Sequence, residues 1–240
     1  MKERPVIFNG EMVRAILDGR KTQTRRLVPE WQRPKYYPEN DDEPHYNWMA
    51  VAQSDRRWGY GVFGETEEAC AKELSTMAPC PFGNAGDRLW VRETFAAFDA
   101  DWKHPGKPHD LKDGPWPNVV YPASVAKIPD GTCRQSIHMP RWASRITLEI
   151  TAVRVERLND ISEEDAKAEG VRAIENNFGN GPAYCDYLLP NLDDAAEWYN
   201  RASDSFKSLW KSIYGAESWR ANPWVWVIEF KRAEAQEKAQ

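Results

Sequence analysis

Hydrophobic and polar residues near the N-terminus follow the spacing of a strand, a helix and a second strand. One face of the helix is formed by Met12, Val13, Ile16 and Leu17. Asn9 or Gly10 can cap this helix at its start, and Gly19 stands where a left-handed C-terminal cap is expected. Residues 5–8 before the helix and residues 22–28 after it have the composition of short strands, so we expect a strand-helix-strand beginning.

Three later segments predict further strands. Residues 88–93 place Leu89 and Val91 on one face, as expected of a half-buried strand. Residues 146–152 alternate in the same way, and the alternation changes phase directly after them, as a β-bulge would produce. Residues 224–230 are apolar on both faces and therefore predict a central strand.

Two later helices are also indicated. Residues 193–214 carry an apolar stripe at steps of three and four, formed by Trp198, Ala202, Phe206, Leu209 and Ile213. Ser162 can cap a shorter helix, and Gly170 stands at a position that stops it, which makes Glu169 its last residue.

Two segments interrupt these elements and read as insertions, at about residues 29–84 and about residues 172–192. The first is rich in proline and aromatic residues, and its acidic stretch at residues 39–44 cannot form a packed element. Its rings can stack on a nucleobase or pack the insertion onto the rest of the fold, and the sequence leaves both uses open. These rings belong to Trp31, Tyr36, Tyr37, Trp48 and Trp58.

Composition restricts the class of protein more than its chemistry. The chain has 240 residues, 41% of them hydrophobic, and its mean hydropathy is -0.74 without an apolar run long enough to span a membrane. The first residues form no apolar signal segment, so we expect a cytoplasmic protein without a membrane partner, whose four cysteines stay reduced. His104 and His109 lack a carboxylate or cysteine at ligand spacing, so we expect no metal and no cofactor.

The distribution of charge is more informative than the net charge of -5. Between residues 14 and 36 the only acidic residues are Asp18 and Glu30, and the basic residues exceed them by five. The seven basic residues are Arg14, Arg20, Lys21, Arg25, Arg26, Arg33 and Lys35. A cationic patch in an acidic protein favours a local anionic ligand, such as a nucleotide or a short RNA segment. The alternative is a basic strand face that acidic residues of the insertion neutralise.

The start of the second strand resembles the signature G-x-K-x-x-E-x-R of the ASCH domain, a small β-barrel of the PUA-like superfamily. Gly19, Lys21 and Arg26 match this signature, and Thr24 stands where many members carry glutamate. The long tryptophan-rich insertions resemble those of ASCH proteins encoded by phages and prophages.

The resemblance also implies a fold. We expect the α+β class, with one elaborated PUA-like (ASCH) β-barrel over residues 1–232 that carries flanking helices and the two sizeable insertions. Residues 233–240 are expected to be a flexible tail.

At Thr24, where this sequence departs from the signature, it resembles a bacterial subgroup of ASCH proteins. These are amidohydrolases that remove the acyl group from acetylated cytidine. The resemblance implies Thr24 as nucleophile, Lys21 as the group that activates it, and Glu169 as the third catalytic residue. The side chains expected to hold a phosphate or hydroxyl of a nucleoside or RNA ligand are those of Arg20, Arg25 and Arg26.

This mechanism sets two conditions on Lys21. A free lysine is protonated at neutral pH, so burial or neighbouring arginines must lower the pKa of Lys21 before it can act as a base. Positions 21 and 24 of an ideal strand also point to opposite faces, so Lys21 must lie in the turn before the strand or a bulge must intervene.

Two other functions stay open at this point. A non-catalytic ASCH module that binds RNA or a nucleotide would use the same basic residues without needing Glu169. An ASCH-type ribonuclease would use Lys21 and the arginines to stabilise charge on a phosphodiester during cleavage.

Overall fold

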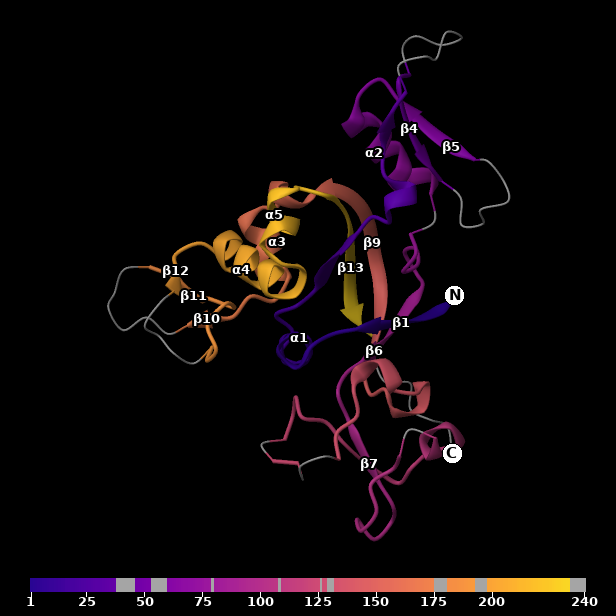
Figure 1. Ribbon diagram of the computed structural model, residues 1–240, viewed down its shortest axis with the longest axis vertical. Helices are drawn as coiled ribbons and strands as arrows, with labels where there is room; N and C mark the ends of the chain where they lie inside the picture. The colour runs from indigo at the N-terminus through magenta and orange to yellow at the C-terminus, as the bar shows by residue number, and fades with distance from the viewer. Residues whose placement is uncertain are drawn as a thin grey trace.

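A five-stranded sheet occupies the centre of the molecule (Figure 1). The computed structural model describes residues 1–37, 46–52, 60–78, 80–107, 109–125, 127–128, 132–174, 181–192 and 198–233. The sheet order is β1-β6-β9-β13-β2, in which β1 runs parallel to β6 and the other neighbours are antiparallel. The strands are β1 (Glu3–Ile7), β2 (Gln23–Leu27), β6 (Arg88–Arg92), β9 (Thr147–Arg157) and β13 (Trp224–Arg232). With the helices described below, this gives an α+β fold.

The strand predictions are confirmed, including the bulge. β13 lies between β9 and β2 and is buried on both faces over most of its length, as its continuous apolar run predicted. Phe230 pairs with Ile150, whereas Glu229 pairs with Ala152. Thr151 is therefore the additional residue of β9, and the sheet bends at this point.

The central sheet is open, which corrects the prediction of a closed barrel. β1 and β2 are its two edges, and the described residues contain no strand pairing between them. Phe8 N still bonds to β6 by donating to the Arg92 carbonyl oxygen at 3.1 Å, and helix α1 then begins at Gly10. The side chain of Arg26 spans the remaining gap by donating from Nη2 to the Ile7 carbonyl oxygen at 2.8 Å.

Helices α1 (Gly10–Leu17), α3 (Glu163–Ala168) and α4 (Ala202–Tyr214) contribute buried residues to the core beside the sheet, and α5 (Ala216–Arg220) packs against α4. Figure 1 shows α3, α4 and α5 grouped on one side of β13. The predicted caps of the first two are present, since Asn9 Oδ1 accepts from Met12 N at 2.8 Å and Ser162 Oγ accepts from Asp165 N at 3.1 Å. A single-turn 3-10 helix, η5 (Leu158–Asp160), leads into α3.

The prediction of one helix over residues 193–214 is wrong at its start. α4 begins at Ala202, and Trp198 instead belongs to β12 (Trp198–Tyr199). This strand closes a small sheet with β10 (Ala173–Ile174) and β11 (Ala183–Cys185), so strand pairing competes successfully with the helical stripe there. Residues 193–197 lie outside the described residues.

The first insertion forms a unit at one end of the molecule (Figure 1). It contains η1 (Glu30–Gln32), β3 (Lys35–Tyr36), β4 (Trp48–Val51), β5 (Gly61–Gly64) and α2 (Glu67–Met77). The helix α2 was not predicted, although Thr66 caps it and Cys70, Ala71 and Leu74 join the main core. Trp48 packs against that core, whereas Tyr36 and Tyr37 are 54% and 46% exposed. Trp58 and the acidic stretch at residues 39–44 lie outside the described residues.

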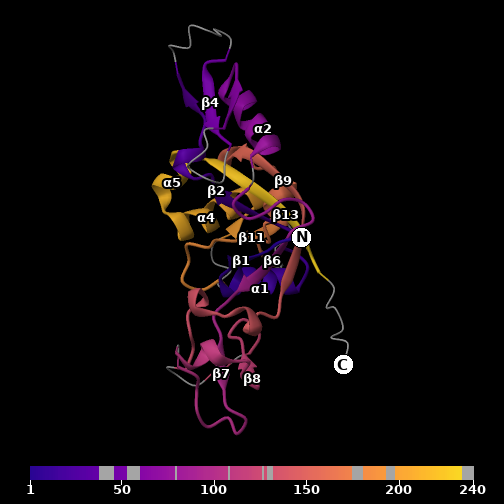
Figure 2. The same ribbon diagram turned by 90° about the vertical axis from the view of Figure 1, so that its right-hand side faces the viewer.

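A second small core lies at the opposite end of the molecule, between β6 and β9 in the chain (Figure 2). It is built around β7 (Ala96–Phe98) and β8 (Asn118–Val120), with the 3-10 helices η2 (Asp110–Asp113), η3 (Ser136–His138) and η4 (Arg141–Ala143). Its buried members are Phe95, Ala97, Leu111, Met139 and Ala143. The sequence patterns did not predict this separate core.

Candidate functional site

Lys21 and Glu169 lie 148 positions apart in the sequence and are in direct contact. Lys21 Nζ donates to Glu169 Oε2 at 2.8 Å and to the Glu169 carbonyl oxygen at 2.7 Å. The backbones of the two residues also form an isolated antiparallel bridge. Only 2% of the Lys21 side chain and 4% of the Glu169 side chain is exposed, so this ion pair is shielded from bulk water.

Two helix ends create the contact. The segment after α1 turns at Gly19, whose φ is 77°, and Lys21 N then donates to the Ala15 carbonyl oxygen at 3.0 Å. α3 ends at Ala168, Glu169 is its C-cap, and Gly170 follows with a φ of 87°. A Cβ at position 170 would lie 2.7 Å from Lys21 Cβ, so only glycine allows the two segments to approach this closely.

Arg25 extends the ion pair into a network. Its fully buried guanidinium donates from Nη1 to Glu169 Oε1 at 3.2 Å. From Nη2 it donates to Asp165 Oδ2 at 2.8 Å and to Glu156 Oε2 at 3.1 Å. Arg154 of β9 also binds the carboxylates of Asp165 and Glu156. Carboxylates on α3 and β9 thus hold Arg25 in place. Its permanent positive charge lies directly beside the Glu169 carboxylate.

The surroundings of Lys21 lower its pKa. Burial is the largest effect and lowers the pKa of Lys21 from its ordinary value of 10.5. The carboxylate of Glu169 opposes this effect, while the positive charges of Arg26 and Arg25 add to it. The pKa of Lys21 is therefore shifted in the direction that a general base at this position requires.

Thr24 is buried in β2 but does not join the network. It pairs in register with Ile228, and strand alternation directs it to the face opposite Arg25. Within the described part of the chain its hydroxyl makes no hydrogen bond to Lys21 or Glu169. Lys21 lies in the turn before β2, which begins at Gln23. The second condition is therefore met, because strand alternation does not determine the direction of the Lys21 side chain.

The remaining two arginines of the motif have different partners. Arg20 donates to the Gly170 carbonyl oxygen at 2.9 Å and to Asp18 Oδ2 at 3.3 Å, beside the Lys21 turn. Arg26 binds no carboxylate among the described residues; it donates to the Ile7 carbonyl oxygen at 2.8 Å and to the Tyr214 hydroxyl at 3.5 Å. Of the three arginines expected to hold a ligand, Arg26 lines the cavity described next.

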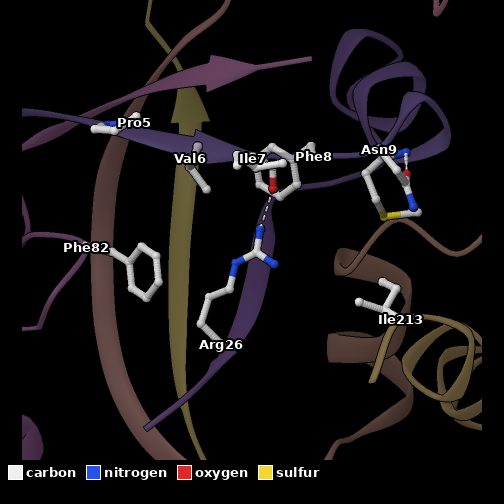
Figure 3. Close-up of a pocket in the computed structure, with 9 residues that line it drawn as sticks. Pro5, Val6, Ile7, Phe8, Asn9, Arg26, Phe82 and Ile213 are labelled. Atoms are coloured by element: carbon white, nitrogen blue, oxygen red, sulfur yellow. Dashed lines mark hydrogen bonds between the residues drawn. The ribbon is translucent and has the colours of Figure 1, made fainter. Parts of the chain in front are cut away.

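This cavity has a volume of about 440 Å³ and lies between the two edges of the sheet (Figure 3). Figure 3 shows the Arg26 side chain reaching towards β1, with Phe82 and Ile213 to either side. The lining is mainly apolar and consists of Pro5, Val6, Ile7, Phe8, Asn9, Met12, Arg26, Phe82 and Ile213. The centre of the Phe8 ring lies 5.2 Å from Arg26 Cζ and 5.6 Å from Lys21 Nζ, so Phe8 links the cavity to the buried lysine.

Sequence reasoning missed Phe8, Asp165 and Glu156 as neighbours of the motif. Asp165 had a usable signal, because residues 165 and 169 are four apart on a helix and face the same side. Glu156 had none, because its position opposite β2 depends on the sheet order. Among the described residues, the positive charges of the motif are paired with carboxylates on α3 and β9 and with Glu11 and Asp18.

Comparisons with known proteins do not extend this description. No family model matches the chain, and neither a curated protein nor a solved structure shows significant similarity to it. Among the described residues, no helix has the length and apolar character that crossing a membrane requires. The same residues contain no group of three or more histidine, cysteine, aspartate or glutamate side chains arranged to hold a metal ion.

Proposed function

We propose that the chain is an ASCH-type amidohydrolase of the PUA-like superfamily that removes the acyl group from an acylated nucleoside, of which acetylcytidine is the model. The observation that carries the proposal is the buried contact between Lys21 and Glu169. The motif resemblance singled out these two residues from distant parts of the sequence, and they meet at 2.8 Å.

The chemistry divides among three side chains. Thr24 Oγ attacks the acyl carbonyl carbon, and Lys21 in its neutral form takes the hydroxyl proton. That proton passes through Glu169 to the amide nitrogen as the C–N bond breaks, which releases the nucleoside amine and leaves the acyl group on Thr24 as an ester. Water hydrolyses the ester and restores the threonine. Arg25 supports this cycle because its positive charge stays paired with the Glu169 carboxylate while Lys21 is neutral.

The cavity between the sheet edges is the proposed entry for the substrate. Its volume lies within the range of about 300–1,000 Å³ that is typical of small-molecule sites. Arg26 and Thr24 are two residues apart in β2 and share a face, and Phe8 contacts both Arg26 and Lys21. A nucleoside held on Arg26 would therefore lie on the face of β2 that carries the proposed nucleophile.

The test is to incubate the purified protein with acetylcytidine and measure the release of cytidine. Thr24→Ala should reduce the rate by about a thousandfold or more, since no other hydroxyl replaces the nucleophile. Thr22→Ala is the matched control, because Thr22 is exposed and precedes β2. Hydrolysis that survives Thr24→Ala, Lys21→Ala and Glu169→Gln alike would rule the proposal out.

Glu169→Gln also gives a distinguishing pH profile. Glu169 raises the pKa of Lys21, so its neutralisation lowers that pKa. If Lys21 is the base, the rising limb of the rate against pH should move to lower pH in the residual activity. A limb that stays in place would mean that Lys21 is not the titrating group.

A second candidate is a non-catalytic nucleotide-binding module. It is favoured by one observation, namely that Lys21, Thr24 and Glu169 are each at most 4% exposed and do not line the cavity, whereas Arg26 does. This candidate predicts that cytidine nucleotides bind in an Arg26-dependent manner, that Glu169→Gln leaves binding unchanged, and that no acyl group is released.

A further inference from the structure

Arginine and tryptophan side chains form a row on one face of β6. Arg88, Trp90 and Arg92 occupy alternate positions of the strand and therefore project from the same face. Leu89 and Val91 between them are 0% and 1% exposed and belong to the main core. The row thus lies on the face of β6 that points away from that core.

The acidic side chains beside the row are already paired. Glu3 lies in register with Arg88 on one side but accepts from Arg141 Nε at 3.1 Å. Glu149 lies in register with Arg88 on the other side but binds Lys231 Nζ at 3.2 Å. Within the described part of the chain, neither arginine of the row forms an ion pair or a hydrogen bond through its side chain. Neither guanidinium of the row is therefore paired directly with a carboxylate of the described residues.

The same two arginines carry buried donors without acceptors. Among the described residues, four buried side-chain nitrogens lack a hydrogen-bond partner, and two of them are the Nε atoms of Arg88 and Arg92. Leaving a buried donor unsatisfied costs about 1–3 kcal/mol, so such atoms are uncommon without a reason. The Nε edge of a guanidinium can bind two oxygens of a phosphate in parallel, which would supply the missing acceptor.

Trp90 holds two guanidinium groups in place. Arg92 Cζ lies 4.7 Å from the centre of the Trp90 ring, and Arg141 Cζ lies 5.8 Å from it. Arg141 is fixed from the other side by its ion pair with Glu3. Planar guanidinium groups that are held in this way are stacking surfaces for unpaired nucleobases.

We propose that this face of β6 binds single-stranded nucleic acid, with Arg88 and Arg92 on phosphates and the stack of Arg92, Trp90 and Arg141 beneath a base. The row follows a strand, which suits a ligand with repeating charges. A duplex hides its bases from the stack, and a net charge of -5 opposes a long duplex contact. An acidic peptide would satisfy the arginines but leave the stacking surface unused. The surface is separate from Lys21 and does not depend on the proposed hydrolase.

The experiment measures binding of a fluorescently labelled single-stranded RNA of about 12 nucleotides, within the roughly 4–16 that known single-strand sites cover. Fluorescence anisotropy at several salt concentrations gives the affinity and its salt dependence. The test variant is Arg88→Gln/Arg92→Gln. The control Arg201→Gln/Arg220→Gln removes the same charge from exposed arginines at the start of α4 and on α5. Circular dichroism verifies that both variants are folded.

We expect the test variant to bind about tenfold more weakly than the wild type. The slope of log affinity against log salt should become shallower by about 0.7 for each phosphate that the variant no longer binds. The control should keep the wild-type affinity within a factor of about two, since its arginines lie elsewhere. An equal loss of affinity in both variants would mean that only the net charge matters and would overturn the proposal.

Competition separates the ligand classes. Unlabelled single-stranded RNA should displace the probe, whereas an RNA duplex, a polyphosphate or a poly-glutamate of matched charge should displace it much less well. Equal or better displacement by the duplex would overturn the single-stranded assignment. Equal displacement by polyphosphate or poly-glutamate would overturn the role of the stack. Failure of the wild type to bind the probe at low salt would overturn the proposal as a whole.

Discussion

Two groups of basic side chains share one face of the central sheet and have opposite surroundings. Arg25 pairs in register with Val227 of β13, and Lys231, four residues further along β13, pairs with Glu149. Glu149 pairs in turn with Arg88, so alternation places Arg25 and Arg88 on the same face. Above Arg25 the helix α3 supplies carboxylates, whereas above Arg88 no such carboxylate is bound among the described residues.

The difference shows that a basic residue is free to bind a ligand only where no packed element supplies it with a carboxylate. The density of basic residues in the sequence does not decide this. The motif is the most basic stretch of the chain, yet Arg25 is bound by three carboxylates and Lys21 by Glu169. The arginines of β6 attract no notice in the sequence, yet they keep free donors. We distinguish the two groups below as the buried network (Lys21, Arg25, Glu156, Asp165 and Glu169) and the β6 row (Arg88, Trp90 and Arg92).

The largest effect is expected from removing the carboxylate at the centre of the buried network. Glu169→Gln leaves Lys21 without its counter-charge in a site that is closed to water. Breaking a buried ion pair on one side costs about 3–5 kcal/mol, and we expect a loss of this size in the free energy of unfolding at neutral pH. Urea denaturation followed by circular dichroism measures it.

The control for this variant is Glu217→Gln, which breaks an exposed pair with Arg220 on α5. It should change stability by at most about 1 kcal/mol. Similar small losses in both variants would mean that the buried network is solvated, and the contrast with the β6 row would disappear.

The second largest effect concerns the glycine that lets α3 approach the lysine. Gly170→Ala forces alanine to a φ of 87° and places its Cβ 2.7 Å from Lys21 Cβ and 2.9 Å from Ala15 Cβ. Strain and overpacking together should cost about 2–4 kcal/mol in the free energy of unfolding.

Gly19→Ala is matched to this variant, because Gly19 also has a positive φ of 77° but has no atom within 4 Å of the added Cβ. It should cost only the conformational part, about 1–2 kcal/mol. If thermal denaturation finds the two variants equally stable, the close approach of α3 to Lys21 does not exist in solution.

A third prediction uses pH to test whether Lys21 is buried. Its pKa is lower in the folded protein than the ordinary 10.5, so the unfolded chain binds more protons between those two values. The free energy of unfolding contributed by Lys21 should therefore increase with pH across this window, by about 1.4 kcal/mol for each pH unit. Lys21→Met removes this contribution.

The measurement is the difference in unfolding free energy between the wild type and Lys21→Met as a function of alkaline pH. The groups that lose stability there are common to both proteins and cancel, such as Tyr187, whose pKa burial raises. A difference that stays flat up to pH 10.5 would show that the lysine is hydrated.

Local signals were enough to predict most elements of the sheet and the positions of two helix caps. The cap at Ser162, the stop at Gly170 and the bulge in β9 all depend on neighbouring residues, and each is present. Trp198 was misassigned because its place in the apolar stripe is a local property, whereas its pairing with Cys185 is not. The open edge between β1 and β2 depends on the path of the chain after Phe8, which no local pattern encodes.

The contacts of the candidate site likewise differ in whether local sequence signals can predict them. The contact of Lys21 with Glu169 was anticipated only because a family resemblance linked two distant segments. Periodicity could place Asp165 beside Glu169, but it could not show that Arg25 would bind both, since this depends on α3 lying over β2. The free donors of the β6 row were equally hidden, because the sequence does not show that Glu3 and Glu149 prefer other partners.

The smallest expected effect is that of a substitution in the β6 row on the free energy of unfolding. It tests the contrast between the two groups directly. Arg88→Gln removes a guanidinium that binds no carboxylate among the described residues, so the free energy of unfolding should decrease by at most about 0.5 kcal/mol. Arg25→Gln, on the same face, removes the partner of three carboxylates and should cost about 3 kcal/mol or more. Parallel urea titrations of the two variants measure the difference. A row that evolved to stabilise the fold would show a loss in Arg88→Gln comparable to that in Arg25→Gln, whereas a surface kept free for a ligand shows an effect of the substitution only when the ligand is present.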